Sequence, residues 1–109
     1  MEATDFPRAE VMQLKSMVEY QQGAIVSRTI IKKLQGNLSL FAFDKGESLS
    51  EHTAPFDAMI QVLDGSAEVI IGGKPYRVSC CETIIMPANI PHAVNAVEKF
   101  KMLLTMIKE

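Results

Sequence analysis

Residues 46–65 read GESLSEHTAPFDAMIQVLDG, and this stretch decides the fold. It begins at a glycine, carries His52, and ends at an Asp-Gly pair of the kind found in turns. Its counterpart is MPANIPHAVNA, residues 86–96, which carries His92. These are the 2 histidines of the chain, and they lie 40 positions apart. The first question that the sequence raises is whether the two imidazoles meet in the folded protein.

Short strands separated by turn residues surround both histidine segments. We expect about eight to ten strands, with turns at the pairs Gly36-Asn37, Asp64-Gly65 and Gly72-Gly73. Antiparallel strands in this number need closure to hide their edges, so the pattern predicts an all-β sandwich or barrel. Alternation predicts which side chains share a face: Leu38, Leu40 and Ala42; Phe41 and Phe43; Ala58, Ile60 and Val62; and Phe100, Met102, Leu104 and Met106.

The first part of the chain has a different character. VMQLKSMVEY, residues 11–20, fits a short helix or a bent strand, and Gly23 interrupts the pattern. We therefore divide the chain into an N-terminal segment, residues 1–24, and a barrel, residues 25–109. The N-terminal segment is expected to pack on the barrel or on a partner subunit.

Composition narrows the function classes. The chain has 109 residues, of which 48% are hydrophobic, and this suits one domain with its own core. A net charge of -2 argues against nucleic-acid binding. We find no secretory signal and no apolar stretch long enough for a bilayer, so we expect a cytoplasmic protein without membrane contact. Cys80 and Cys81 are adjacent, where a disulfide is strained, and we interpret both as structural.

The spacing in residues 46–65 resembles the first motif of the cupin superfamily. That motif has a glycine, five residues, His-x-His, three residues, a glutamate, six residues and a second glycine. Gly46, His52 and Gly65 stand in register with it. Ala54 occupies the position of the second histidine, and Ala58 occupies the position of the glutamate.

The segment around His92 resembles the second cupin motif, which runs glycine, five residues, Pro-x-Gly, two residues, histidine, three residues and asparagine. Asparagine tolerates left-handed backbone, so Asn89 is an acceptable replacement for the second glycine. Cysteine is less suited to the first glycine position, and we expect a turn without positive φ at Cys81. The matched positions are Pro87 and His92, and the changed ones are Cys81, Asn89 and Ala96.

This resemblance extends over about residues 25–107 and implies a cupin jelly-roll barrel (double-stranded β-helix) with a divalent metal at its mouth. Cupins hold that metal with three histidines and a glutamate, so His52 and His92 are the ligands that remain here. Asp57 is the candidate third ligand. The ion would be Fe, Mn, Ni or Zn, or the site holds no metal. Ala54 and Ala58 remove bulk and charge, which predicts a roomier and more apolar pocket.

Two functions follow from the resemblance, and the sequence does not choose between them. The first is a small-molecule enzyme of the isomerase, lyase or dioxygenase type, with His52 and His92 holding a metal. The alternative is a non-catalytic ligand-binding or sensor cupin without metal. A third interpretation treats the barrel as a scaffold for protein contacts. Cupins commonly pair through strands outside the barrel, so we expect a homodimer. The sequence indicates no substrate class.

Overall fold

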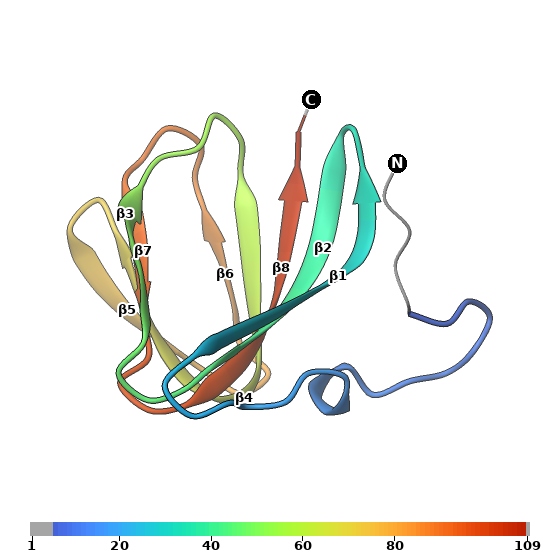
Figure 1. Cartoon of the computed structure of the whole chain (residues 1–109). Coiled ribbons are helices and arrows are strands. Elements are labelled where there is room, and N and C mark those ends of the chain that lie inside the picture. Colours follow the sequence, from blue (N-terminus) through green and yellow to red (C-terminus); the bar gives the residue numbers. More distant parts are fainter. Residues whose placement is uncertain (1–5, 109) are drawn as a thin grey trace.

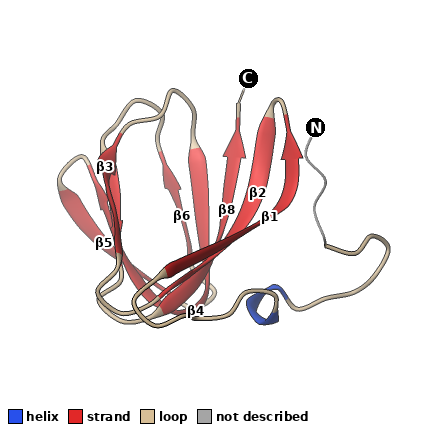
Figure 2. Ribbon diagram, viewed as in Figure 1, coloured by secondary structure: helices blue, strands red, loops and turns tan. Residues whose placement is uncertain are grey.

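The computed structural model describes residues 6–108, which form an antiparallel β-structure curled into a half-barrel (Figure 1, Figure 2). Eight strands and one short 3-10 turn make up the regular structure of this range. They are η1 Leu14–Ser16, β1 Ile25–Lys33, β2 Gly36–Phe43, β3 Ser48–His52, β4 Ala58–Ile71, β5 Lys74–Ser79, β6 Thr83–Met86, β7 His92–Asn95 and β8 Phe100–Ile107. Among residues 6–108, no helix is long and apolar enough to cross a bilayer.

Strand β4 is the longest, and it joins the two walls of the half-barrel. Its first half pairs with β6 and β8, and its second half pairs with β5 and β7. The strand order is β1-β2-β8-β4-β7-β3, with β5 and β6 paired to β4 off this path. The all-β jelly-roll prediction is confirmed, and the strand count of the described residues falls within the expected range.

The Asp64-Gly65 pair lies inside β4, so the prediction of a hairpin at this pair is wrong. Gly65 has a φ of 73°, and the pairing register of β4 with β8 shifts between Val62 and Asp64. A side chain at Gly65 would collide with the backbone oxygen of Lys99. The pair marks a bulge where β4 bends from one wall to the other, since a positive φ with no room for a side chain requires glycine.

The other predicted turns lie close to their expected places. Gly72 and Gly73 connect β4 to β5 with φ values of 57° and 82°. The turn after β1 falls at residues 34–35, just before the predicted Gly36-Asn37 pair, because Lys33 already pairs with Gly36. Gly36 therefore begins β2 and does not form the turn.

Cys81 adopts a left-handed backbone, so the expectation of a turn without positive φ is wrong. Its φ is 73°, in a turn that the Glu82 N–H closes by donating to the Ser79 oxygen at 2.9 Å. The Cys81 N–H also donates to the oxygen of Val62 at 2.7 Å. This second bond ties the turn to β4 and holds the cysteine in a conformation that normally favours glycine.

The inner cluster fills the space between the two walls. The predicted sharing of faces in β2, β4 and β8 is confirmed, because one complete set from each strand belongs to this cluster or packs against it. Phe43 and Phe100 lie at its centre with stacked rings, 4.5 Å between centroids, and both are fully buried. The buried members are Phe43, Ala58, Ile60, Val62, Ala67, Val69, Val78, Met86, Val94, Ala96, Phe100 and Met102.

The outer cluster lies on the opposite face of β1, β2 and β8, under the N-terminal segment. Leu40 and Ala42 point outward here, as the alternation in β2 predicts. Phe6 and Val18 cover them from the N-terminal segment and are 4% and 1% exposed. The buried members are Phe6, Val18, Ile30, Leu40, Ala42 and Leu103.

The short helix considered for residues 11–20 is reduced to the 3-10 turn Leu14–Ser16. Gln13 precedes this turn without a side-chain capping hydrogen bond. A ten-residue helix is marginal in water without tertiary support. The irregular course instead spreads Met12, Leu14 and Met17 over the outer face of the sheet, where they pack against the outer cluster.

Candidate functional site

The structure brings the two histidines together at one end of the half-barrel. His52 ends β3, His92 begins β7, and the two residues are paired partners across these antiparallel strands. Their Nε2 atoms are 3.2 Å apart, and the ring centroids are 4.4 Å apart with an angle of 70° between the planes. Strand pairing alone therefore aligns two side chains that lie 40 positions apart in the sequence.

Backbone carbonyls determine which nitrogen of each ring carries a proton. Nδ1 of His52 lies 2.9 Å from the Ser50 oxygen, and Nδ1 of His92 lies 3.2 Å from the Ile90 oxygen. A carbonyl oxygen only accepts, so each Nδ1 must donate. In the neutral state both Nε2 atoms then present lone pairs to each other. A proton or a metal ion between them would replace this repulsion by attraction.

The two rings differ in their surroundings. His92 is 4% exposed, whereas His52 is exposed at the outer side of the pair. Burial has the largest effect on the pKa of His92 and lowers it; the hydrogen bond to Ile90 raises it by less, and the neighbouring His52 lowers it by the smallest amount. His92 is therefore the neutral, inward member of the pair near neutral pH.

The cavity beneath the two imidazoles is apolar and small, with a volume of about 60 Å³. Typical small-molecule sites measure roughly 300–1,000 Å³. Ala54 and Ala58 both line the cavity, yet the roomier pocket that they predicted is not present. The reason is that flexible and aromatic side chains from β4, β6, β8 and the β3–β4 loop occupy the space: Phe56, Ile60, Met86, Met102, Leu104 and Met106.

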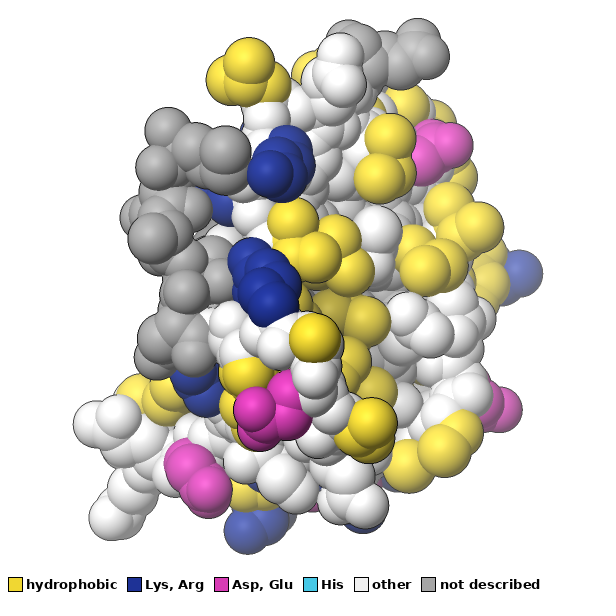
Figure 3. Space-filling model, turned by 90° about the vertical axis from the view of Figure 1, so that its right-hand side faces the viewer, with side chains coloured by type: hydrophobic (Ala, Val, Ile, Leu, Met, Phe, Trp, Pro, Cys, Tyr) yellow, Lys and Arg dark blue, Asp and Glu magenta, His cyan; other side chains and the backbone are white. Residues whose placement is uncertain are grey.

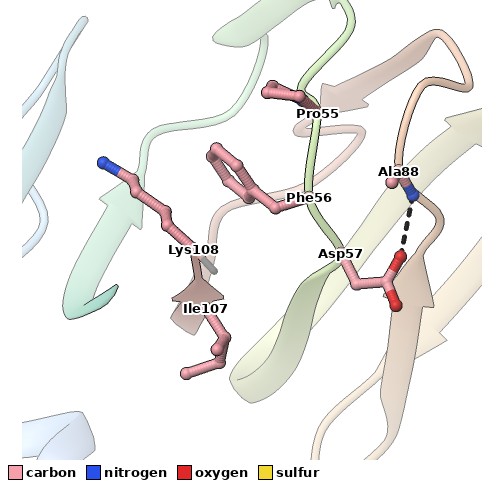
Figure 4. Close-up of a pocket in the computed structure, with 6 residues that line it drawn as sticks. All are labelled: Pro55, Phe56, Asp57, Ala88, Ile107 and Lys108. Carbon is pink, nitrogen blue, oxygen red and sulfur yellow. Dashed lines mark hydrogen bonds between the residues drawn. The ribbon is translucent and has the colours of Figure 1, made fainter. Parts of the chain in front are cut away.

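Asp57 lies apart from the histidine pair. Its Oδ1 accepts a hydrogen bond of 2.8 Å from the Ala88 N–H, and its side chain points toward that loop (Figure 4). This direction agrees with strand alternation, which sends Asp57 away from the face of Ala58. Among residues 6–108, no three His, Cys, Asp or Glu side chains are grouped closely enough to hold a metal ion.

A broad groove of about 670 Å³ lies at the rim beside Asp57, lined by Pro55, Phe56, Asp57, Ala88, Ile107 and Lys108 (Figure 4). Phe56 lines both this groove and the small cavity, so the two spaces adjoin at this residue. Sequence reasoning did not find this groove. The Pro-Phe pair after His52 was the available signal, whereas Lys108 joins the groove only through the pairing of β8.

The donor set fits a metal ion only in part. Two Nε2 lone pairs converge, and both rings are oriented through Nδ1 as metal-binding imidazoles usually are. Catalytic zinc, however, normally has three protein ligands and a water. Ala54 and Ala58 supply no donor, so water or a bound molecule would have to complete the coordination.

Comparison with known proteins identifies the family. The family model of the cupin domain matches residues 39–108. A conserved protein of unknown function from Streptococcus pyogenes has a TM-score of 0.93 and 39% identity, over 100% of this chain and 96% of that one.

Two further solved structures are similar to this chain. A cupin 2 conserved barrel domain protein from Leptotrichia buccalis has a TM-score of 0.86 and 47% identity, over 89% of this chain but only 47% of that one. A cupin superfamily protein from Desulfitobacterium hafniense has a TM-score of 0.92 at 24% identity, over the full length of both chains, and this supports the fold alone. No curated protein matches. The cupin domain covers most of the chain and the relatives share its fold, so the chain belongs to the cupin family.

Proposed function

We propose that this cupin binds a small molecule at the mouth of its barrel, with His52 and His92 as the polar anchor. The observation that carries the proposal is the pair of facing Nε2 acceptors, 3.2 Å apart, at the edge of an otherwise apolar cavity. Small-molecule sites combine an apolar lining with a few polar groups in this way.

The chemistry of the pair favours a ligand that donates a proton or a hydrogen bond. Both Nε2 atoms are acceptors when the rings are neutral, so a hydroxyl, an acidic proton or an N–H group would satisfy them. The 60 Å³ beneath them has room for a short apolar group. We therefore favour a small weak acid or enol with a short hydrocarbon part.

A larger ligand would need the cavity to open. Met86, Met102 and Met106 line it, and methionine side chains rearrange readily because they are unbranched. Phe56 lines both the cavity and the rim groove, so a change of its rotamer would be the simplest way to join the two spaces. The rim groove is thus the expected entry side.

A divalent metal is the second candidate ligand, and the facing lone pairs favour it. His52 and His92 would hold the ion, and Fe, Mn, Ni or Zn suit imidazole ligands. A bound ion would supply Lewis-acid or redox chemistry of the isomerase, lyase or dioxygenase type. Since Asp57 is engaged by Ala88, only two protein ligands support the ion, and we expect its affinity to be weaker than in cupins with the full ligand set.

Thermal stability with added ligand tests the proposal. Small weak acids and the four divalent metals are screened separately, and a ligand at a hundredfold excess over its Kd should stabilise the fold by about 2.7 kcal/mol. His52→Gln and His92→Gln should abolish the shift, whereas Asp57→Asn, at the rim groove, should retain it. If neither a weak acid nor a metal stabilises the protein through the histidines, the proposal is wrong.

We also propose a homodimer. Strand β1 is an edge strand of the sheet. Near the β1–β2 turn, the side chains of Ile31 and Leu34 are 38% and 97% exposed. Figure 3 shows that hydrophobic side chains gather among Lys and Arg side chains on the face seen there. Light scattering should find a dimer at micromolar concentration, and a monomer at all concentrations would contradict this proposal.

A further inference from the structure

The turn between β5 and β6 carries two thiols that the proposed function does not use. Cys80 and Cys81 are both free and exposed. Their Sγ atoms lie 3.4 Å apart, and the Cys80 thiol also contacts the oxygen of Leu63 at 3.4 Å. The left-handed φ of 73° at Cys81 is unfavourable for a residue with a side chain. The turn thus keeps two sulfur atoms together at a position that suits glycine.

The distance between the two sulfur atoms favours binding of one atom by both thiols over formation of a disulfide. A disulfide needs an S–S distance of about 2.05 Å and usually joins Cα atoms roughly 4.4–6.8 Å apart. Adjacent Cα atoms are only about 3.8 Å apart, so this disulfide would be strained. A single atom X could instead bond to both sulfurs. With X–S bonds of about 2.3 Å, the length of a metal–thiolate bond, the 3.4 Å separation of the sulfurs corresponds to an S–X–S angle of about 95°.

The small angle and the number of ligands both favour one class of ligand. A tetrahedral zinc ion prefers about 109° and four ligands, whereas residues 6–108 assemble no third His, Cys, Asp or Glu ligand beside the two thiols. Trivalent arsenic has one lone pair, which compresses its bond angles toward a right angle, and it binds sulfur strongly. We propose that Cys80 and Cys81 form a dithiol site that captures a trivalent arsenical through both sulfurs.

The reaction balances without an oxidant. Phenylarsine oxide and two thiols give a phenylarsenic dithiolate and one water. Two As–S bonds form, the arsenic–oxygen bond and two S–H bonds break, and the oxygen leaves with both protons. Arsenic stays trivalent. The hydrogen bond to Cys81 raises the pKa of Cys80, and desolvation raises it by a smaller amount. Cys80 therefore stays protonated, and the condensation consumes protonated thiols.

The surroundings leave room for the third substituent on arsenic. Cys81 borders a groove of about 390 Å³ between residues 13–15 of the N-terminal segment and residues 61–63 of β4. Leu14, Val62 and Leu63 supply apolar surface, and Lys15 and Gln61 supply polar groups. An organic arsenical with an aryl group therefore suits this site better than one with a charged substituent.

Titration of the reduced protein with phenylarsine oxide tests the proposal. We expect one arsenical per chain by intact mass, loss of both free thiols, and retention in excess glutathione until a dithiol such as dimercaptopropanol removes it. Chelation by two thiols should bind about a hundredfold tighter than one thiol. Cys80→Ser, Cys81→Ser and Cys81→Gly should therefore all lose retention, and the glycine variant keeps the turn because its φ suits glycine.

His52→Gln should bind the arsenical unchanged, which separates this site from the barrel mouth. Three results would overturn the proposal: single-thiol variants that retain the arsenical like the parent, zinc binding as tightly as the arsenical, or thiol loss that produces only a disulfide.

Discussion

The inner and outer clusters use opposite faces of the same strands, yet they are completed in different ways. Strand side chains from both walls close the inner cluster, and Phe43 and Phe100 stack at its centre. An irregular segment closes the outer cluster. Its contacts to the sheet include the Arg28 guanidinium, 4.3 Å from the centroid of the Phe6 ring, and the Lys101 Nζ, which donates to the Lys15 oxygen at 2.6 Å.

This difference separates global from local stability. The inner cluster cannot open without breaking strand pairs on both walls, so its loss means unfolding of the whole domain. The N-terminal segment can leave the outer cluster while the sheet stays paired, which is a sub-global opening. The two candidate binding sites are associated with different clusters. The histidine pair lies at the end of the inner cluster, and the groove bordered by Cys81 lies at the edge of the N-terminal segment.

Truncation of Phe100 should have the largest effect. Phe100 is fully buried and stacked on Phe43, so Phe100→Ala should lower the free energy of unfolding by about 3–5 kcal/mol. Chemical denaturation followed by circular dichroism measures it, with Ile85→Ala, 58% exposed, as the neutral control. A loss no greater than that of the control would mean that the inner cluster does not determine global stability.

Truncation of Phe6 should have a smaller and local effect. Phe6 is 4% exposed, but the N-terminal segment can detach when its contact is lost. We expect Phe6→Ala to lower the free energy of unfolding by only about 1–2 kcal/mol. Limited proteolysis should cut residues 6–24 faster and leave the strands intact. Uniform acceleration of cleavage across β1 to β8 would show that the two clusters unfold as one.

The alternation of side chains made the inner face predictable. Phe100, Met102, Leu104 and Met106 follow a period of two, and the strand pairing uses that period directly. The bend at Gly65 was not predictable from local sequence, because an Asp-Gly pair suits a hairpin and a bulge equally well. Long-range pairing of β4 with β8 decides between them.

The candidate site also has one feature that the sequence predicts and one that it does not. The motif spacing pointed to His52 and His92, and their pairing across β3 and β7 follows from the register of these strands. The cavity volume could not be inferred from Ala54 and Ala58, because it depends on how side chains such as Met86 pack into the freed space. The conformation of the N-terminal segment was the hardest to predict, because it depends on contacts with the sheet and not on a local periodicity of hydrophobic residues.

Replacement of Cys81 by glycine should stabilise the domain by about 1 kcal/mol, because a left-handed conformation is unfavourable for a residue with a Cβ. This change tests the turn that borders the groove beside the N-terminal segment. Denaturant unfolding of the reduced protein measures it. Cys80→Ala serves as the control, since Cys80 does not have a positive φ and should gain nothing from losing its thiol. Destabilisation by Cys81→Gly would mean that the thiol contributes more than the backbone conformation removes.

The smallest effect should appear in the pH dependence of stability, at the histidine end of the inner cluster. Burial lowers the pKa of His92 from its usual 6.5, so the unfolded chain binds a proton more readily than the folded one. The free energy of unfolding should therefore be fully maintained above about pH 7.5 and fall as the pH decreases below the usual histidine pKa of 6.5.

His92→Gln removes the titrating group, so the slope of unfolding free energy against pH should become shallower over this range, whatever the absolute stability of the variant. Thr53→Ala keeps both histidines at an exposed neighbouring position, and its slope should match that of the parent. An unchanged slope in His92→Gln would mean that burial in the folded protein does not lower the pKa of His92.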